Sequence, residues 1–326
     1  MVFFKISTVG DPGITFRSIS ETSFSVLPSR TTSFGGIENP FPKDVTPIES
    51  KTAKGSIFTL CGYIKDGDKV YVITSVLKLF TTTILPKLEE NNISIKLITG
   101  ACVKGVPSEI SSLHKIDYIK RFFTESSSIQ YWFTQNYDLH DNHERIIPIP
   151  LGLDYHTLQK QNHWWGLKQS AVEQDAMMEK LYTSSLQFDA RKNQSFSFYH
   201  FVLFDRHDRD RYKANNALQN KSFNVFLKNR CNRETTWNIC RSYKYIISPH
   251  GNGLDCHRTY EAMCLGCIPI VRSSSLDILY KDMPVIILDS WNNISLETLE
   301  NLSKEVLQCS RDKLLLRYWT TYIDKL

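Results

Sequence analysis

Long apolar runs are missing from this sequence of 326 residues. The two longest, residues 262–271 and 146–153, fall well short of the roughly 18 residues that a membrane-spanning helix needs. Residues 1–7 lack the basic segment and the long apolar segment of a secretory signal peptide. These absences predict a cytoplasmic protein without a membrane anchor.

Cysteine and net charge are also low. Eight cysteines are too few for a disulfide scaffold in a chain of this length, and the pair Cys264 and Cys267 has no second pair at the spacing of a zinc site. No Asp-x-Asp pair follows a strand candidate in a way that would hold Mg²⁺, so we expect no metal. The net charge of +5 is too small to indicate nucleic acid, which needs a clustered basic face, but it suits an anionic small molecule.

Short β-branched and aromatic runs alternate with helical patterns along most of the chain. Strands are expected at 69–74, 94–99, 129–133, 145–150, 196–204, 223–227, 245–248, 268–271 and 285–288, and helices at 76–90, 111–123, 169–183, 208–219, 234–242, 258–265 and 295–326. Residues 152–166 form a connector between the two series. This alternation predicts parallel sheets that are covered by helices on both faces.

The two β/α series predict two Rossmann-like domains with a helical tail. We place the first domain at residues 1–155, the second at 156–300, and a C-terminal helix at 301–326 that crosses back to the first domain. Ligands of open α/β sheets bind outside the carboxyl ends of the strands. The first domain is expected to bind an acceptor and the second a donor.

The most informative stretch is residues 245–271, YIISPHGNGLDCHRTYEAMCLGCIPIV. A glycine loop follows a strand there and precedes a helix, which lets backbone N–H groups and the positive end of the helix approach a phosphate. Arg258 and Glu261 are three residues apart and share one helix face. The arginine suits a diphosphate and the carboxylate suits ribose hydroxyls, a combination that a sugar nucleotide needs.

Plainer interpretations of the same residues stay open. The segment also fits a helix cap with a surface pair between Arg258 and Glu261. His250 is either structural or a contact to the transferred sugar. Arg211 is the best-placed arginine of the run DRHDRDR, which is either a phosphate contact or a solvated charge run. Trp164 and Trp165 either stack on a sugar or seal the domain junction.

The segment resembles the signature of the exostosin-like glycosyltransferases. The matching elements are Ser248-Pro249, Gly251-Asn252-Gly253, Arg258, Glu261-Ala262 and Gly266-Cys267-Ile268-Pro269. Residues 145–158 and 285–291 resemble the inter-domain segment of that family and the strand and loop after its signature. The resemblance covers about residues 129–300, and the chain is similar to the soluble members from large algal viruses, which would place it in the host cytoplasm.

The resemblance implies a GT-B arrangement of the two domains and an inverting glycosyltransferase with a nucleotide-sugar donor. Because Arg258 and the helix dipole can replace a metal ion, we expect catalysis without a metal or cofactor. The donor would be a UDP-sugar such as UDP-xylose, and the acceptor a hydroxyl of a glycan or glycoprotein. The expected donor-binding residues are Arg211, Ser248, His250, Gly251, Asn252, Gly253, Asp255, Arg258 and Glu261.

An inverting transfer also needs a general base for the acceptor hydroxyl, usually a carboxylate or histidine. The candidates are Asp138, Asp154 and His156, with Glu109 as a weaker alternative. A rival function is a non-catalytic nucleotide- or carbohydrate-binding protein on the same fold. A glycoside hydrolase is a third reading, but it would need two carboxylates across a sugar site, and no such pair is evident.

Overall fold

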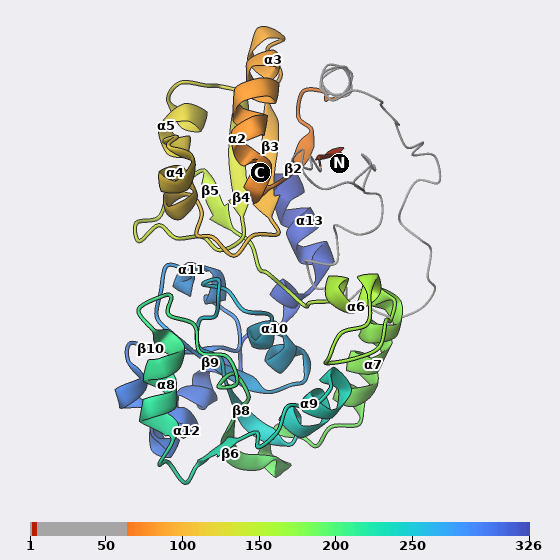
Figure 1. The fold of residues 1–326 in the computed structure, drawn as a ribbon, viewed down its shortest axis with the longest axis vertical. Helices are drawn as coiled ribbons and strands as arrows, with labels where there is room; N and C mark the ends of the chain where they lie inside the picture. The colour runs from red at the N-terminus through yellow and green to blue at the C-terminus, as the bar shows by residue number, and fades with distance from the viewer. Residues whose placement is uncertain (1, 5–63) are drawn as a thin grey trace. The chain divides into compact units, whose positions relative to one another are not determined.

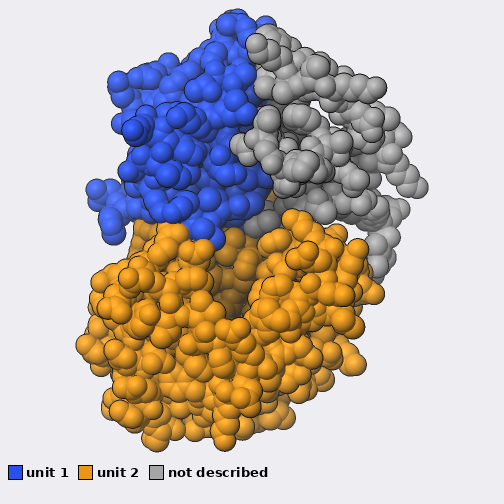
Figure 2. All heavy atoms as spheres, viewed as in Figure 1, with its two compact units in different colours: residues 1–23, 32–149, 326 blue, residues 24–31, 150–325 orange. Residues whose placement is uncertain are grey.

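The computed structural model describes residues 2–4 and 64–326. The chain divides into two compact units, coloured separately in Figure 2; among the described residues, unit 1 holds 2–4, 64–149 and 326, and unit 2 holds 150–325. Residues 5–63, which begin the expected first domain, lie outside the described part. Each unit is built on a five-stranded parallel sheet. The predicted α/β fold with two Rossmann-like units is therefore confirmed.

Unit 1 has the strand order β1-β2-β3-β4-β5. Its strands are β1 (Val2–Phe4), β2 (Lys69–Ile73), β3 (Ile95–Gly100), β4 (Ile129–Thr134) and β5 (Ile146–Pro148). Its helices are α2 (Leu77–Leu79), α3 (Leu85–Glu90), α4 (Ser108–His114) and α5 (Tyr118–Phe123) (Figure 1). Trp132 of β4 is fully buried and packs its ring edge to face with Phe122 of α5, which fixes that helix on the sheet.

Two helices of unit 1 differ from the sequence prediction. The expected helix 111–123 is two helices, because Lys115 ends α4 in a left-handed conformation with φ 56°. The expected helix 76–90 is not one regular α-helix. A π-helical turn at Phe80–Ile84 separates α2 from α3, and Pro86 sits in the first turn of α3, a position that tolerates proline.

Unit 2 has the strand order β10-β9-β8-β6-β7. Its strands are β6 (Lys192–Ser197), β7 (Asn224–Phe226), β8 (Tyr243–Ile247), β9 (Ile268–Arg272) and β10 (Ile286–Leu288). Counted along unit 2 this is the order 2-1-3-4-5 of a doubly wound sheet. The core joins Ile247 of β8 and Ile270 of β9 to Leu299 of α12.

Several helices of unit 2 pack against its sheet (Figure 1). The helices of this unit are α6 (His156–Lys160), α7 (Ala171–Thr183), α8 (Asp210–Leu218), α9 (Arg233–Cys240), α10 (His257–Cys264), α11 (Asp277–Tyr280), α12 (Leu296–Val306) and α13 (Leu316–Lys325). α9 contacts β8, α10 contacts β9, and α12 contacts β10. None of the helices in the described part is long and apolar enough to span a membrane.

Local signals fix several of these boundaries. Ser170 and Glu173 form the capping box that starts α7, and the Ser295 hydroxyl caps α12. Two expectations were wrong. The tail 295–326 is two helices rather than one, and the strand expected at 196–204 ends at Ser197. Residues 198–209 are instead a loop at the carboxyl end of β6.

Candidate functional site

The topology of unit 2 marks one place for a ligand. In a sheet of order 2-1-3-4-5 the connections after the first and third strands leave in opposite directions, which opens a crevice at their carboxyl ends. Those strands are β6 and β8, which pair directly. The crevice is therefore bounded by the loop 198–209 and by the loop 248–256, which contains the glycines singled out from the sequence.

Arg211, in the first turn of α8, is buried in this crevice with 8% of its surface exposed. Its Nη1 donates to the Val202 carbonyl at 2.7 Å and its Nε donates to the His250 carbonyl at 3.2 Å. These bonds join the two loops. Burial, and next the positive charge of Arg258, lower the pKa of Arg211 to about 10.

Arg258 on α10 supplies a second cation beside the first. Its Nη1 donates to the Ser248 hydroxyl and the Pro249 carbonyl, both at 3.3 Å. Its guanidinium carbon lies 5.4 Å from the ring centre of Phe198. In the described part of the chain neither Arg211 nor Arg258 forms an ion pair with a carboxylate. Two neighbouring guanidinium groups without a counter-charge favour a bound anion with at least two negative charges.

Unpartnered polar atoms gather at the same place. Arg258 Nε, Tyr199 Oη and His250 Nε2 are buried atoms without a hydrogen-bond partner in the protein. The Arg258 guanidinium carbon lies 5.8 Å from the ring centre of Tyr199. Buried polar atoms are nearly always hydrogen-bonded, so these three groups are suited to a polar ligand.

The glycine loop makes room for Arg211, and two of its N–H groups are already bonded within the protein. A Cβ atom on Gly251 would lie 2.7 Å from Arg211 Nη2 and 3.1 Å from the Cys256 sulfur. The Gly251 N–H donates to the Gly253 carbonyl at 3.0 Å, and the His250 N–H donates to Asp210 at 2.8 Å. The expectation that the N–H groups of this loop bind phosphate is therefore wrong for residues 250 and 251. Gly251 allows the close approach of Arg211 instead.

Other residues of the expected donor set have different surroundings. Asp255 is buried and accepts hydrogen bonds from Tyr260 at 2.6 Å and Tyr280 at 2.9 Å, so it anchors the start of α10. The Asn252 side chain is exposed and accepts from Arg206 at 3.4 Å. Glu261 is half-buried and, within the described residues, makes no ion pair with Arg258. The surface pair left open by the sequence is thus not formed.

The loop 198–209 is strained where it meets the glycine loop. His207, Asp208 and Arg209 have φ values of 50°, 57° and 55°. Three consecutive non-glycine residues in the left-handed region are energetically unfavourable and must be held by their surroundings. His207 Nε2 lies 3.4 Å from the Asn252 carbonyl, and the His207 carbonyl accepts from Arg272 at 2.9 Å.

Two of the three base candidates come together in unit 2. His156 Nδ1 lies 2.8 Å from Asp154 Oδ1, and the His156 ring centre is 6.3 Å from that of His257, the first residue of α10. Burial raises the pKa of Asp154, but the close contact with His156 and the charges of His257 and Arg233 outweigh it and hold that pKa below its usual range. A carboxylate on Nδ1 orients the ring and leaves Nε2 as the basic nitrogen.

Asp138 has another environment. Its carboxylate accepts the N–H groups of Ser108 at 2.7 Å and Glu109 at 2.8 Å. These are the first two residues of α4 in unit 1, so Asp138 stabilises a helix start. The Glu109 carboxylate in turn accepts from Gly105 at 2.7 Å and pairs with Lys104 at 3.0 Å. Both carboxylates are thus used within unit 1.

Tyr199 and Asp210 were missed by sequence reasoning. Tyr199 was assigned to a strand. Asp210 is fully buried and accepts from His250 N–H at 2.8 Å and Trp291 Nε1 at 2.7 Å, and it pairs with Arg272 at 2.6 Å. It therefore fixes the start of the glycine loop. Its position just before Arg211 was the only signal for it.

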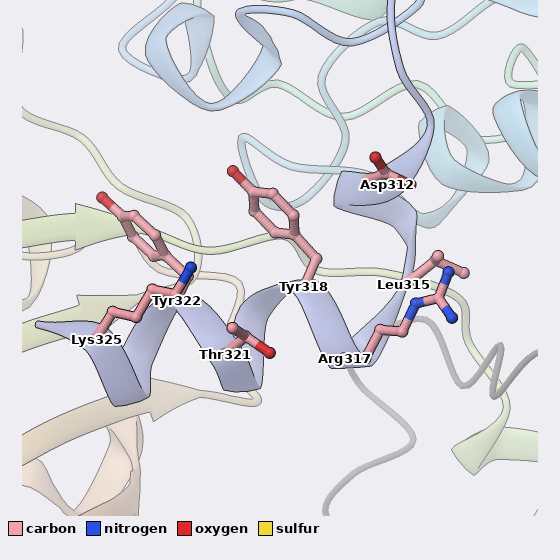
Figure 3. A pocket seen from close by; sticks show the side chains of 7 residues that line it. All are labelled: Asp312, Leu315, Arg317, Tyr318, Thr321, Tyr322 and Lys325. Carbon is pink, nitrogen blue, oxygen red and sulfur yellow. The ribbon is translucent and has the colours of Figure 1, made fainter.

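One further hollow of the described residues lies outside this site. A hollow along residues 310–325 is lined by Asp312, Leu315, Arg317, Tyr318, Thr321, Tyr322 and Lys325 (Figure 3), none of which is in the expected set. In the described ranges, no group of three or more His, Cys, Asp or Glu side chains is placed to hold a metal ion.

Comparisons with known proteins give a likeness of structure but none of sequence. No protein-family model and no curated protein sequence matches the chain. A crystal structure of an α1,3-fucosyltransferase is 14% identical in sequence, with a TM-score of 0.35. The match covers 68% of this chain and 65% of the fucosyltransferase chain. A crystal structure of an α1,3-fucosyltransferase with GDP-fucose is 12% identical, with a TM-score of 0.34, and the match covers 82% of this chain and 83% of the fucosyltransferase chain. Function is therefore inferred from the side chains of unit 2, and the relation to the exostosin-like family stays a prediction.

Proposed function

We propose that the chain is a glycosyltransferase that moves a sugar from a nucleoside diphosphate sugar to a hydroxyl of a glycan. The observation that carries this proposal is the pair Arg211 and Arg258 at the switch point of the unit 2 sheet, for which the described residues supply no carboxylate partner. A diphosphate supplies the two negative charges that this pair lacks. Ligand binding at that crevice is the general behaviour of doubly wound sheets.

The same pair fits the chemistry of the leaving group. When the bond between the anomeric carbon and the diphosphate breaks, its electron pair and negative charge pass to the β-phosphate oxygen. Cations already fixed at that position stabilise the transition state without reorganising. Arg211 is held by backbone carbonyls of both loops, so its position does not depend on the ligand. This arrangement supports departure of the diphosphate without a metal ion.

His156 is the proposed general base, with Asp154 as its positioning residue. His156 Nε2 would take the proton of the acceptor hydroxyl as that oxygen attacks the anomeric carbon opposite the leaving diphosphate, which inverts the configuration. The 2.8 Å contact with Asp154 holds the ring and stabilises its protonated form. The products are the glycoside, the nucleoside diphosphate and a proton on His156.

The finer assignments rest on the exostosin-like signature. They are a UDP-sugar such as UDP-xylose as donor, a GT-B arrangement of the two units, and contacts from Glu261 to the ribose and from His250 to the sugar or β-phosphate. Glu261 follows Arg258 by one helical turn on α10, which supports a ribose next to the diphosphate.

Release of nucleoside diphosphate tests the proposal. The protein is incubated with UDP- and GDP-sugars, with EDTA and with Mg²⁺, and free UDP or GDP is measured over time. We expect slow hydrolysis of one donor without acceptor, unchanged by EDTA and lost in His156→Gln. Binding of the donor without any release would instead support the non-catalytic binding protein.

A further inference from the structure

An exposed tryptophan lies on a tight turn of unit 2. His163 and Gly166 exchange two backbone hydrogen bonds of 2.9 and 3.0 Å, which close the turn that carries Trp164 and Trp165. Trp164 is 58% exposed, whereas Trp237 of α9 is 2% exposed. A tryptophan that only filled the core would be buried like Trp237, because burial of its large apolar surface is favourable.

Side chains from α9 and from the preceding loop hold the turn in place. The Arg233 N–H donates to the Trp165 carbonyl at 2.6 Å, and its guanidinium carbon lies 5.1 Å from the centre of the Trp165 ring. The Arg230 guanidinium lies 5.3 Å from the centre of the Trp164 ring. These contacts fix the indole rings before any ligand binds, so little conformational freedom is lost on binding.

The turn is linked by contacts to both parts of the proposed active site. Arg230 donates to the Phe201 carbonyl at 3.1 Å, and Phe201 is adjacent to Val202, whose carbonyl holds Arg211. On the other side, Arg233 Nη2 lies 3.7 Å from Asp154 Oδ2. The exposed indole is therefore linked through Arg230 to the loop that holds Arg211. A longer chain of contacts, through Trp165, Arg233 and Asp154, links it to His156.

We propose that Trp164, with Arg230 at its edge, is the acceptor subsite, on which a pyranose ring of the glycan stacks. One face of a pyranose is a patch of C–H groups that suits an aromatic surface, and its equatorial hydroxyls suit the donors of a neighbouring guanidinium. This subsite rests on the proposed function, since it takes the acceptor hydroxyl to be activated by His156. It assigns acceptor recognition to unit 2 as well as donor binding.

The test is ¹⁹F NMR of the full chain labelled with 5-fluorotryptophan. The Trp164 resonance is assigned by its loss in Trp164→Phe. The labelled protein is titrated with cellotetraose, xylotetraose, chitotetraose and lacto-N-tetraose, and separately with UDP and GDP. We expect at least one tetrasaccharide to shift the Trp164 resonance, and the nucleotides alone to leave it in place.

Variants give the size of the effect. Trp164→Ala is expected to weaken tetrasaccharide binding about five- to tenfold, the value of one stacked aromatic contact, and to leave nucleotide affinity unchanged. Trp164→Phe retains part of the binding. Leu167→Ala is the matched control, because Leu167 is 75% exposed on the segment that follows the same turn and carries no aromatic ring.

Each contrary result has its own meaning. Saccharide binding that moves other tryptophan resonances and not that of Trp164 would overturn the subsite, as would the absence of any response to the four saccharides. A shift of the Trp164 resonance caused by UDP or GDP alone would mean that Trp164 stacks on the nucleobase, and this would also overturn the acceptor subsite. If no nucleotide binds but a tetrasaccharide shifts Trp164, the saccharide platform stands and the transferase proposal fails.

Discussion

Replacing Arg258 with alanine is expected to separate ligand affinity from stability. In the described part of the chain only Nη1 of Arg258 has protein partners, at 3.3 Å, which leaves Nε and Nη2 for a diphosphate. A hydrogen bond to a charged group contributes about 1.5–3 kcal/mol. Losing two such bonds at the lower value costs about 3 kcal/mol, which corresponds to roughly a 100-fold loss of affinity.

The stability of the same variant should change little. The two weak bonds and the contacts with the Phe198 and Tyr199 rings are lost, each worth about 0.5–1 kcal/mol. Against this, the variant removes a positive charge that lowers the pKa of the buried Arg211. Because these effects oppose each other, we expect the melting temperature to stay within about 4 °C of the wild type.

The assay is calorimetric titration with UDP and GDP, together with thermal unfolding of the same samples. Arg121→Ala is the matched control, because Arg121 of unit 1 forms two hydrogen bonds to Glu89, of 2.7 and 2.9 Å. It should lose about 1 kcal/mol of unfolding free energy and keep its nucleotide affinity. Unchanged affinity in Arg258→Ala, or a variant that does not fold, would refute the assignment of Arg258 to the diphosphate.

Three further predictions concern residues of unit 2. Gly251→Ala places a Cβ 2.7 Å from Arg211 Nη2 and should weaken nucleotide binding about tenfold by displacing a buried guanidinium. If the variant binds nucleotide with wild-type affinity in a calorimetric titration, the role of Gly251 is contradicted. His156→Gln should lower kcat about 100-fold or more at unchanged donor KM, whereas His140→Gln, on an exposed loop of unit 1, should match the wild type. Since the folded pKa of Asp154 is held below its unfolded value, its ionised form stabilises the protein above the unfolded pKa, and this contribution is lost as the pH falls through the folded pKa. Asp154→Asn should therefore flatten the fall of unfolding free energy below about pH 5, measured by urea unfolding across pH; an unchanged slope would contradict the shift.

Local sequence signals were sufficient for most elements. β8 and β9 are β-branched runs between turn residues, and the start of α7 has a complete capping box. The spacing of Arg258 and Glu261 predicted one helix face, and both lie on α10. These features depend on neighbours within about four residues, which the sequence displays directly.

Features that depend on distant residues were not visible in the sequence. The sequence predicts one strand at 196–204, but β6 pairs with β7 and β8 only as far as Ser197. Tyr199 therefore turns into the loop beside Arg258. The surroundings of the pair Asp154 and His156 also depend on distant residues, because His257 of α10 lies beside His156. Arg233, which approaches this pair from α9, has no local signal.

Binding of UDP and GDP to the wild-type protein, with and without EDTA, tests the central claim most directly. A ligand that binds only the folded state at 100 times its Kd raises the unfolding free energy by about 2.7 kcal/mol, so thermal unfolding detects it. We expect one of the two nucleotides to stabilise the protein equally in both buffers and Arg258→Ala to lose the effect. No stabilisation by either nucleotide, or stabilisation only with a divalent cation, would contradict it.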